Sequence, residues 1–173
     1  AGLSAASLLA RAGHDVCIFE KNQSIREIGA GIQISPNGFC VLKELDLSED
    51  IIRNSLCNTS VLICDYQDGD RLIQFNQKSV LGNENFRLIH RADLINLLYQ
   101  SAVINKVRFN LGCTADANLL SAQYSIVIAA DGAHSKTRSL LNTYQSKSKR
   151  SEYFAYRSIV PNQDAHHNGV RIT

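Results

Sequence analysis

The chain has 173 residues, a formal net charge of +2, and a composition that is 45% hydrophobic and 20% charged. These values are typical of a globular domain, and they exclude a disordered tail or a small disulfide-stapled scaffold. The sequence contains no methionine. Because a natural reading frame starts with one, we expect a processed or cropped product.

The first twenty residues predict a helix followed by a buried strand. Apolar residues recur at helical spacing up to Gly13, which indicates a helix over 2–12. The apolar run 15–20 then predicts a short strand that ends on Glu20. A helix, a tight turn and a strand form the second half of a βαβ unit, so the sequence favours an α/β fold.

The middle of the chain predicts a second helix and a β-hairpin. Ser35 and Pro36 suit the N-cap and the first position of a helix that continues to about Leu47. The runs 61–66 and 71–75 flank an Asp-Gly pair, which predicts a hairpin.

The rest of the chain alternates strands with a helix. Strands are predicted over 86–90, 107–111, 124–130 and 153–160, and a helix over 92–102. Since Glu20 and Asp131 each follow an apolar run, we expect a parallel sheet with binding loops at its carboxyl ends.

Charge and cysteine patterns exclude several classes of partner. The net charge of +2 is too small to indicate a nucleic acid or a membrane surface, and no apolar run reaches the about 18 residues of a membrane span. The five cysteines lack zinc-ligand spacing, so we expect no metal site and a reducing, cytoplasmic location.

Gly2 and Glu20 have the spacing of a dinucleotide-binding motif. In such a motif a glycine-rich turn lets the backbone approach a pyrophosphate, and an acid about twenty residues later binds the ribose hydroxyls. Only the last glycine of GxGxxG is present here. An acid at the end of a strand also occurs in ordinary turns, which leaves a purely structural role open.

Four segments in chain order resemble the flavin-dependent aromatic hydroxylases, a family with salicylate hydroxylase-like and p-hydroxybenzoate hydroxylase-like members. The segments are AGLSAASLLARAGHDVCIFEK at 1–21, EIGAGIQISPNG at 27–38, HRADLINLL at 90–98 and IVIAADGAHSKTR at 126–138. The last segment matches the family's DGxxSxxR signature. A fifth, weaker match is AYRSIVP at 155–161, which is similar to the strand that opens the substrate domain.

The resemblance implies a fold and a domain order. Residues 1–150 would form a Rossmann-like FAD/NAD(P)-binding domain with a mixed sheet that lacks its first strand, with a hairpin excursion at about 58–86 toward the substrate domain. Residues 151–173 would begin a β-rich substrate domain. The chain is then expected to be an N-terminal fragment that starts between the second and third glycines of the cofactor loop.

The resemblance also implies an activity. The parent protein is expected to be a FAD-dependent, NAD(P)H-using monooxygenase that takes O₂ and hydroxylates a phenolic or similar small hydrophobic compound through a flavin hydroperoxide. The alternative is a truncated or degenerate relative that is not catalytic and retains only the FAD-binding fold. The cofactor residues that the resemblance implies are Gly2, Glu20, Lys21, Gly29, Ala30, Gly31, Gln33, Arg91, Asp131 and Gly132.

The resemblance assigns roles to some of these residues. Glu20 would bind the adenosine ribose, Gly2 would face the pyrophosphate, and Arg91 would bind phosphate or ribityl oxygens. Asp131 and Gly132 would lie near both FAD and NAD(P)H, and a nearby arginine, Arg138, would add a supporting charge.

Three assignments keep alternatives. Arg91 could instead pair with Asp93 or another surface acid, and the Asp131-Gly132 pair could be a simple turn after a buried strand. Arg157 is the candidate catalytic residue, on the substrate or flavin side.

Overall fold

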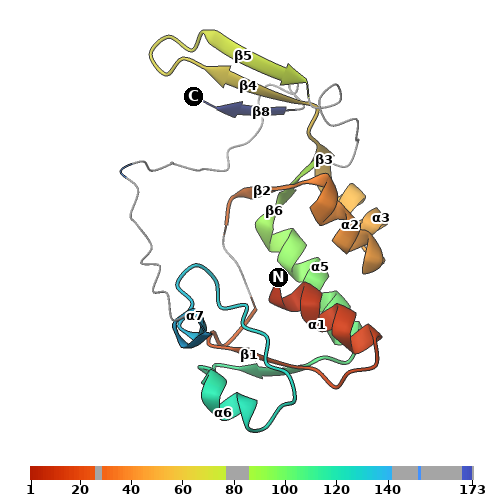
Figure 1. Cartoon of the computed structure of the whole chain (residues 1–173). Coiled ribbons are helices and arrows are strands. Elements are labelled where there is room, and N and C mark those ends of the chain that lie inside the picture. The colour runs from red at the N-terminus through yellow and green to blue at the C-terminus, as the bar shows by residue number, and fades with distance from the viewer. Residues whose placement is uncertain (26–28, 77–85, 142–151, 153–168, 173) are drawn as a thin grey trace. The chain divides into compact units, whose positions relative to one another are not determined.

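The computed structural model describes residues 1–25, 29–76, 86–141, 152 and 169–172 (Figure 1). The chain forms two compact units, of which the first comprises residues 1–25 and 98–157 and the second comprises residues 26–97 and 158–173. None of the helices in these described ranges is long and apolar enough to cross a membrane.

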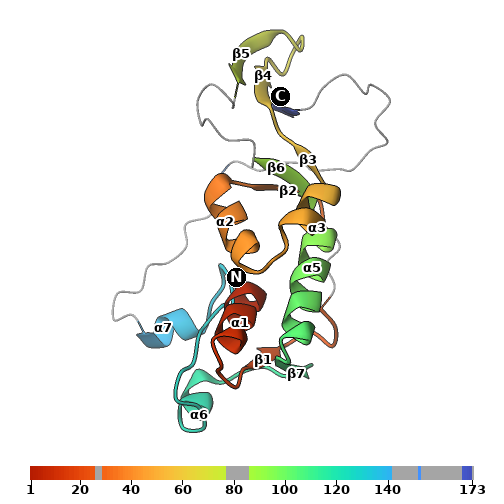
Figure 2. The same cartoon turned by 90° about the vertical axis from the view of Figure 1, so that its right-hand side faces the viewer.

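The first unit is built on a parallel pair of strands. Strand β1 (Cys17–Glu20) pairs with β7 (Arg108–Leu111), and helix α1 (Gly2–Arg11) packs against β1 (Figure 2). These elements confirm the helix and the two strands expected from the sequence. The core of the unit consists of Ala6, Ala102 and Val107, with Leu3, Ala10, Val16, Ile18 and Phe109 packed against them.

Helix α5 (Arg91–Ile104) spans the boundary between the units at residue 98, and its second half supplies Ala102 to the core of the first unit. Two short helices, α6 (Ala117–Ser121) and α7 (Thr137–Leu141), follow β7. Asp116 caps α6, where its side chain accepts the backbone N–H groups of Asn118 and Leu119.

The predicted strand 124–130 is wrong. The segment 126–130 has no regular secondary structure, and Ile126 and Ile128 are 72% and 56% exposed. A strand forms only where a neighbouring strand satisfies its backbone N–H and C=O groups. Among the described residues no strand pairs with this segment, so its apolar sequence does not produce a strand.

The second unit contains an antiparallel sheet of three short strands. Strands β2 (Gly31–Ile34), β6 (Arg87–His90) and β3 (Ser55–Cys57) lie in the order β2-β6-β3. Helices α2 (Pro36–Glu44) and α3 (Ser48–Arg53) follow β2 in the chain. The buried apolar residues of these elements and of the α2–α3 connection are Ile34, Phe39, Leu42, Leu45, Leu47, Ile51 and Ile89.

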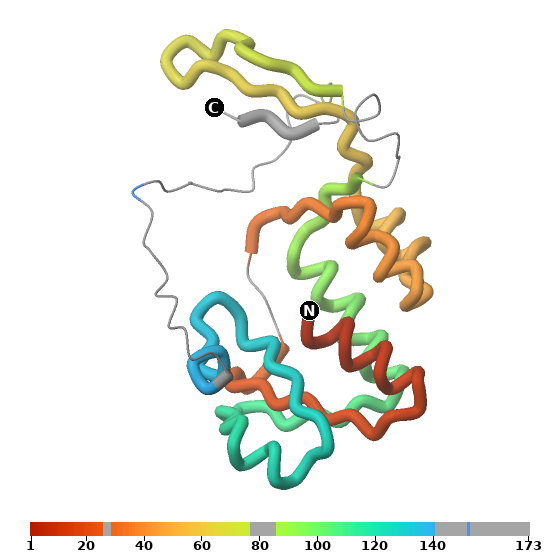
Figure 3. Tube along the Cα trace, viewed as in Figure 1, coloured from red at the N-terminus to blue at the C-terminus, as the bar shows by residue number. Residues whose placement is uncertain are grey.

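The same unit contains the predicted hairpin. Strands β4 (Ser60–Cys64) and β5 (Arg71–Asn76) are antiparallel and lie side by side (Figure 3). Strand β8 (Gly169–Ile172) pairs with β4 in parallel. Gly69 adopts φ +78° in the connecting turn, which a residue without Cβ adopts at low cost. The predicted strand 153–160 lies outside the described residues, and the proposed domain boundary at residue 150 stays a prediction.

Candidate cofactor-binding site

The predicted cofactor residues fall into two groups, one in each unit. The first unit holds Gly2, Glu20, Lys21, Asp131 and Gly132, and the second unit holds Gly29, Ala30, Gly31, Gln33 and Arg91. The candidate catalytic residue, Arg157, lies outside the described residues.

Glu20 lies at the carboxyl end of β1, next to the end of the parallel strand β7. Its carboxylate Oε1 accepts the backbone N–H of Asn22 at 2.9 Å. Because a carboxylate offers about four lone-pair sites, Glu20 retains acceptor capacity for ligand hydroxyls. The adjacent Lys21 is exposed.

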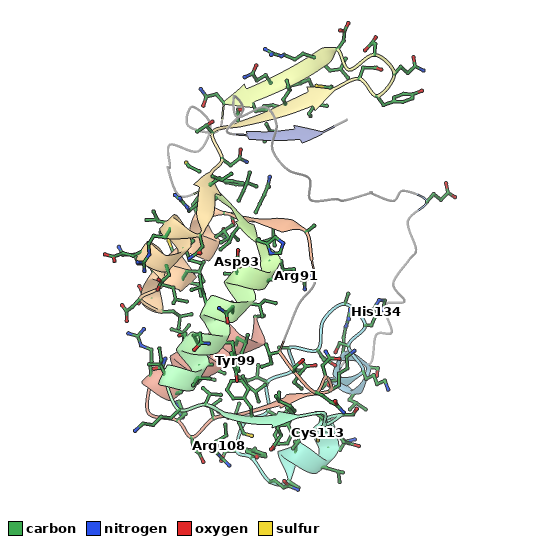
Figure 4. The ribbon with its side chains drawn as sticks, turned by 180° about the vertical axis from the view of Figure 1, so that it is seen from behind. Arg91, Asp93, Tyr99, Arg108, Cys113 and His134 are labelled. Carbon is green, nitrogen blue, oxygen red and sulfur yellow. The ribbon has the colours of Figure 1, made fainter. Side chains whose placement is uncertain are left out.

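The turns that follow β1 and β7 are bonded to each other. The N–H of Cys113 donates to the carbonyl oxygen of Glu20 at 3.0 Å, and the N–H of Gly112 donates to the carbonyl oxygen of Asn22 at 2.9 Å. Gly112 has φ +69°. The exposed Cys113 therefore lies beside Glu20, at the end of β7 (Figure 4).

The start of α1 approaches the segment before Asp131 closely. A Cβ added at Gly2 would lie 3.3 Å from the Cβ of Ala130. Only glycine provides this space without a shift of the neighbour. The last glycine of a dinucleotide-binding motif has this role of close packing between a helix and a strand segment, and the contact brings the helix start close to the Asp131–Gly132 pair.

Asp131 begins a hydrogen-bonded loop. Its Oδ2 accepts the backbone N–H of Thr137 at 3.3 Å and the Oγ1 hydroxyl of Thr137 at 3.2 Å. The hydroxyl of Ser135, together with these bonds from Thr137, lowers the pKa of Asp131 to about 2. The carboxylate is therefore ionised at neutral pH.

This low pKa predicts how stability depends on pH. The pKa of Asp131 is about 2 in the folded chain against 3.8 for the free side chain. The ionised carboxylate therefore adds to the free energy of unfolding above about pH 4, and this stabilisation is lost as the pH falls toward 2. When urea unfolding is measured at several pH values, the free energy of unfolding of Asp131→Asn should decrease less between about pH 4 and pH 2 than that of the wild type. Parallel curves for the variant and the wild type would contradict the prediction.

In the second unit, the glycine-rich segment and Arg91 lie together. The backbone N–H of Arg91 donates to the carbonyl oxygen of Ala30 at 3.4 Å, and Gly31 lies opposite His90 in the β2–β6 register. Gln33 is exposed on β2, and Arg91 is exposed in the first turn of α5, which also carries Asp93 (Figure 4). The segment 29–31, which has no bulky side chains, thus lies next to the positively charged residue Arg91.

Curated proteins similar to this chain share one chemistry. This chain is 31% identical to the 3-amino-4-hydroxybenzoate 2-monooxygenase of Streptomyces cremeus, and the match covers 93% of this chain and 44% of the relative. It is 28% identical, over 87% of its length and 36% of the relative, to an FAD-dependent monooxygenase of Colletotrichum higginsianum. The chain is a homologue of FAD-dependent aromatic monooxygenases. This relationship confirms the resemblance that the motifs indicated.

A solved structure supports the same relationship to the aromatic monooxygenases. The crystal structure of 2-methyl-3-hydroxypyridine-5-carboxylic acid oxygenase matches with a TM-score of 0.56 and 25% identity, over 64% of this chain and 28% of the oxygenase. No family model matches the chain. The chain spans less than half the length of the two curated monooxygenases.

The sequence did not single out three residues of this candidate site. Ala130 was expected only as part of a buried strand, although a small residue before the Asp-Gly pair is compatible with close packing on Gly2. Thr137 was treated only as part of the signature segment, and its spacing of six from Asp131 is the available signal. Cys113 carried no signal, because its proximity to Glu20 depends on pairing between β1 and β7.

Cys113 provides a test of where an adenosine group binds in this monooxygenase homologue. If FAD occupies the carboxyl end of β1 and β7, it should slow alkylation of the exposed Cys113 by N-ethylmaleimide about tenfold or more. Cys40, which is exposed on α2, is the matched control and should react at an unchanged rate. Mass spectrometry of labelled peptides measures both rates, and equal rates at Cys113 with and without FAD would contradict this placement.

Proposed function

We propose that this chain is part of the FAD-binding region of an NAD(P)H-using monooxygenase that hydroxylates a small phenolic compound with O₂. The observation that carries the proposal is the first unit's combination of Glu20 at the end of a parallel strand with the close contact between Gly2 and Ala130. These two features suit the ribose and the pyrophosphate of a dinucleotide.

Each group of residues has a task in this proposal. Glu20 accepts hydrogen bonds from the adenosine ribose, as the carboxylate at the end of the second strand does in dinucleotide-binding folds. Arg91 contributes a positive charge for phosphate oxygens, and the segment 29–31 lets the backbone pass close to the cofactor. When bound, FAD supplies the electron-transfer and oxygen-activating chemistry.

The substrate part of the proposal rests on the relatives. The names of the two curated relatives and of the solved oxygenase describe monooxygenase or oxygenase activity. Two of these names include a ring compound with a hydroxyl and a carboxyl group. We propose that the substrate of this protein is also a ring compound with a hydroxyl and a carboxyl group, and that NADH or NADPH is the reductant. Arg157 remains the candidate for the substrate or flavin side.

The complete reading frame that encodes this chain tests the proposal. The purified protein should carry flavin absorbance at about 450 nm, and its oxidation of NADH or NADPH should depend on FAD and increase with added 3-hydroxybenzoate. Benzoate, which lacks the ring hydroxyl, is the control compound. Flavin-free protein whose NAD(P)H oxidation ignores both FAD and phenols would refute the proposal.

The cysteines support a cytoplasmic location as a further part of the proposal. The five cysteines, all in the described part of the chain, form no disulfide bonds, and Cys40 and Cys113 are exposed. Exposed thiols persist in a reducing compartment. Fractionation of cells that express the complete reading frame checks this location, and recovery of the protein from an oxidising compartment would contradict it.

A further inference from the structure

Two consecutive peptide groups after β7 hold the turn that begins at Glu20. The backbone N–H of Gly112 donates to the carbonyl oxygen of Asn22 at 2.9 Å, and the N–H of Cys113 donates to the carbonyl oxygen of Glu20 at 3.0 Å. The two acceptors lie two residues apart, and their order along the chain is opposite to that of the two donors. The backbone must therefore turn between the two donors.

Gly112 makes this turn. Its φ and ψ angles set the direction of the Cys113 N–H relative to its own N–H, and its φ is +69°. Glycine adopts this left-handed conformation freely, whereas a residue with a Cβ adopts it at a cost. A Cβ at this position would lie 3.6 Å from Cγ of Gln23, which is ordinary van der Waals contact. The backbone conformation, and not crowding, therefore favours glycine here.

Asn22 connects Gly112 to the Glu20 carboxylate. Its carbonyl oxygen accepts the Gly112 N–H, and its own N–H donates to Oε1 of Glu20 at 2.9 Å. Residues 21–24 are exposed, so backbone hydrogen bonds rather than close packing hold this turn. The bond from Asn22 orients the carboxylate and leaves its other lone pairs for a ligand.

We propose that Gly112 is a positioning residue that fixes the Glu20 carboxylate for the ribose hydroxyls of a dinucleotide. This inference rests on the proposed function, in which Glu20 binds the adenosine ribose. Gly112 acts through Asn22 and needs no contact with the ligand. An acceptor that is already fixed loses less conformational freedom when the ligand binds, so it binds the ligand more tightly than a mobile acceptor.

Two substitutions of Gly112, made in the protein from the complete reading frame, test this role. Gly112→Ala adds a methyl group that fits but disfavours the positive φ, and it should weaken binding of FAD to the apoprotein about 5-fold to 10-fold. Asparagine tolerates the left-handed conformation, so Gly112→Asn should return the Kd to within about twofold of the wild type. A side chain that merely blocked the ligand would give the reverse order, because asparagine is larger than alanine.

Gly13→Ala is the matched control for strain. Gly13 has φ +93°, and a Cβ there would meet open space among the described residues. It lies between α1 and β1, beyond the opposite end of β1 from Glu20. The substitution should lower the free energy of unfolding in urea, as Gly112→Ala does, but should change the Kd for FAD less than about twofold. Equal weakening of FAD binding by both variants would overturn the inference.

A double-mutant cycle with Glu20→Ala shows whether Gly112 acts through the carboxylate. In the Glu20→Ala background there is no carboxylate to orient, so Gly112→Ala should change the Kd less than about twofold. The same fold-change in both backgrounds would show that Gly112 does not act through Glu20, and it would overturn the inference.

Hydrogen exchange in the flavin-free protein provides a readout that does not depend on FAD. The amides of Asn22 and Cys113 should exchange faster in Gly112→Ala than in the wild type, and Gly112→Asn should restore their protection. Unchanged exchange in Gly112→Ala, or unchanged FAD binding by this variant when the wild type binds FAD, overturns the inference alone. Wild-type protein that does not bind FAD overturns the proposed function and the inference together.

Discussion

Replacement of Glu20 by glutamine should weaken FAD binding about 30-fold. The carboxylate lies at the end of β1 and retains acceptor sites beyond its bond to Asn22. A charge-assisted hydrogen bond to a ribose hydroxyl contributes about 2 kcal/mol, and this loss corresponds to about 30-fold in Kd. Fluorescence titration of the apoprotein with FAD measures the effect.

Asp15→Asn is the matched control for this experiment. Asp15 lies just before the opposite end of β1, where its carboxylate pairs with Arg108 at 2.8 Å. Both side chains of this pair are exposed, so the substitution should change FAD affinity less than twofold. If Asp15→Asn and Glu20→Gln weaken binding equally, the effect belongs to general charge loss and not to a ribose contact.

Gly2→Val should destabilise the protein by about 2–3 kcal/mol and weaken FAD binding at least about tenfold. A Cβ at residue 2 would already lie 3.3 Å from the Cβ of Ala130, and the two methyl groups of valine extend further. Overpacking of this kind typically costs about 1–3 kcal/mol, and it should move the helix start away from the loop that follows Ala130. Urea unfolding and FAD titration measure the two effects.

Two further variants test the cause of the Gly2 effect. Gly2→Ala needs a shift of only a few tenths of an ångström, so it should cost less than about 1 kcal/mol after the gain in helix propensity. Ala130→Gly removes the opposing methyl group and should restore part of the stability of Gly2→Val. No recovery in the double variant would show that the contact with Ala130 is not the constraint.

Local patterns correctly predicted the elements that have a strong apolar signal. The helix over 2–12 and the strands at 15–20 and 107–111 correspond to α1, β1 and β7, and the hairpin was found through its Asp-Gly turn. Strand β3 and helix α3 were missed because they span only 3 and 6 residues, and β2 was missed because it begins with a glycine, a residue that is depleted in strands. Such short elements contain too few residues to establish a periodicity.

The site was predictable to the extent that it depends on neighbours in sequence. Glu20 follows an apolar strand, so its place at the carboxyl end of β1 was predictable. The contact of Gly2 with Ala130 was not, because it joins residues 128 positions apart. Arg138 was singled out from its signature segment as a supporting charge, but no sequence pattern indicated that its guanidinium bonds carbonyl groups of its own loop.

The sequence by itself determined the relationship to the aromatic monooxygenases and the expectation that β1 pairs with a parallel strand. It also determined which residues are candidates for binding a cofactor. The tertiary structure decided which of these residues meet: Ala30 with Arg91, Gly2 with Ala130, and Cys113 with Glu20. It also decided that the apolar run 126–130 is not a strand. The physical reason is that local propensity depends on a residue and its neighbours in sequence, whereas strand formation and close packing require a partner from elsewhere in the chain.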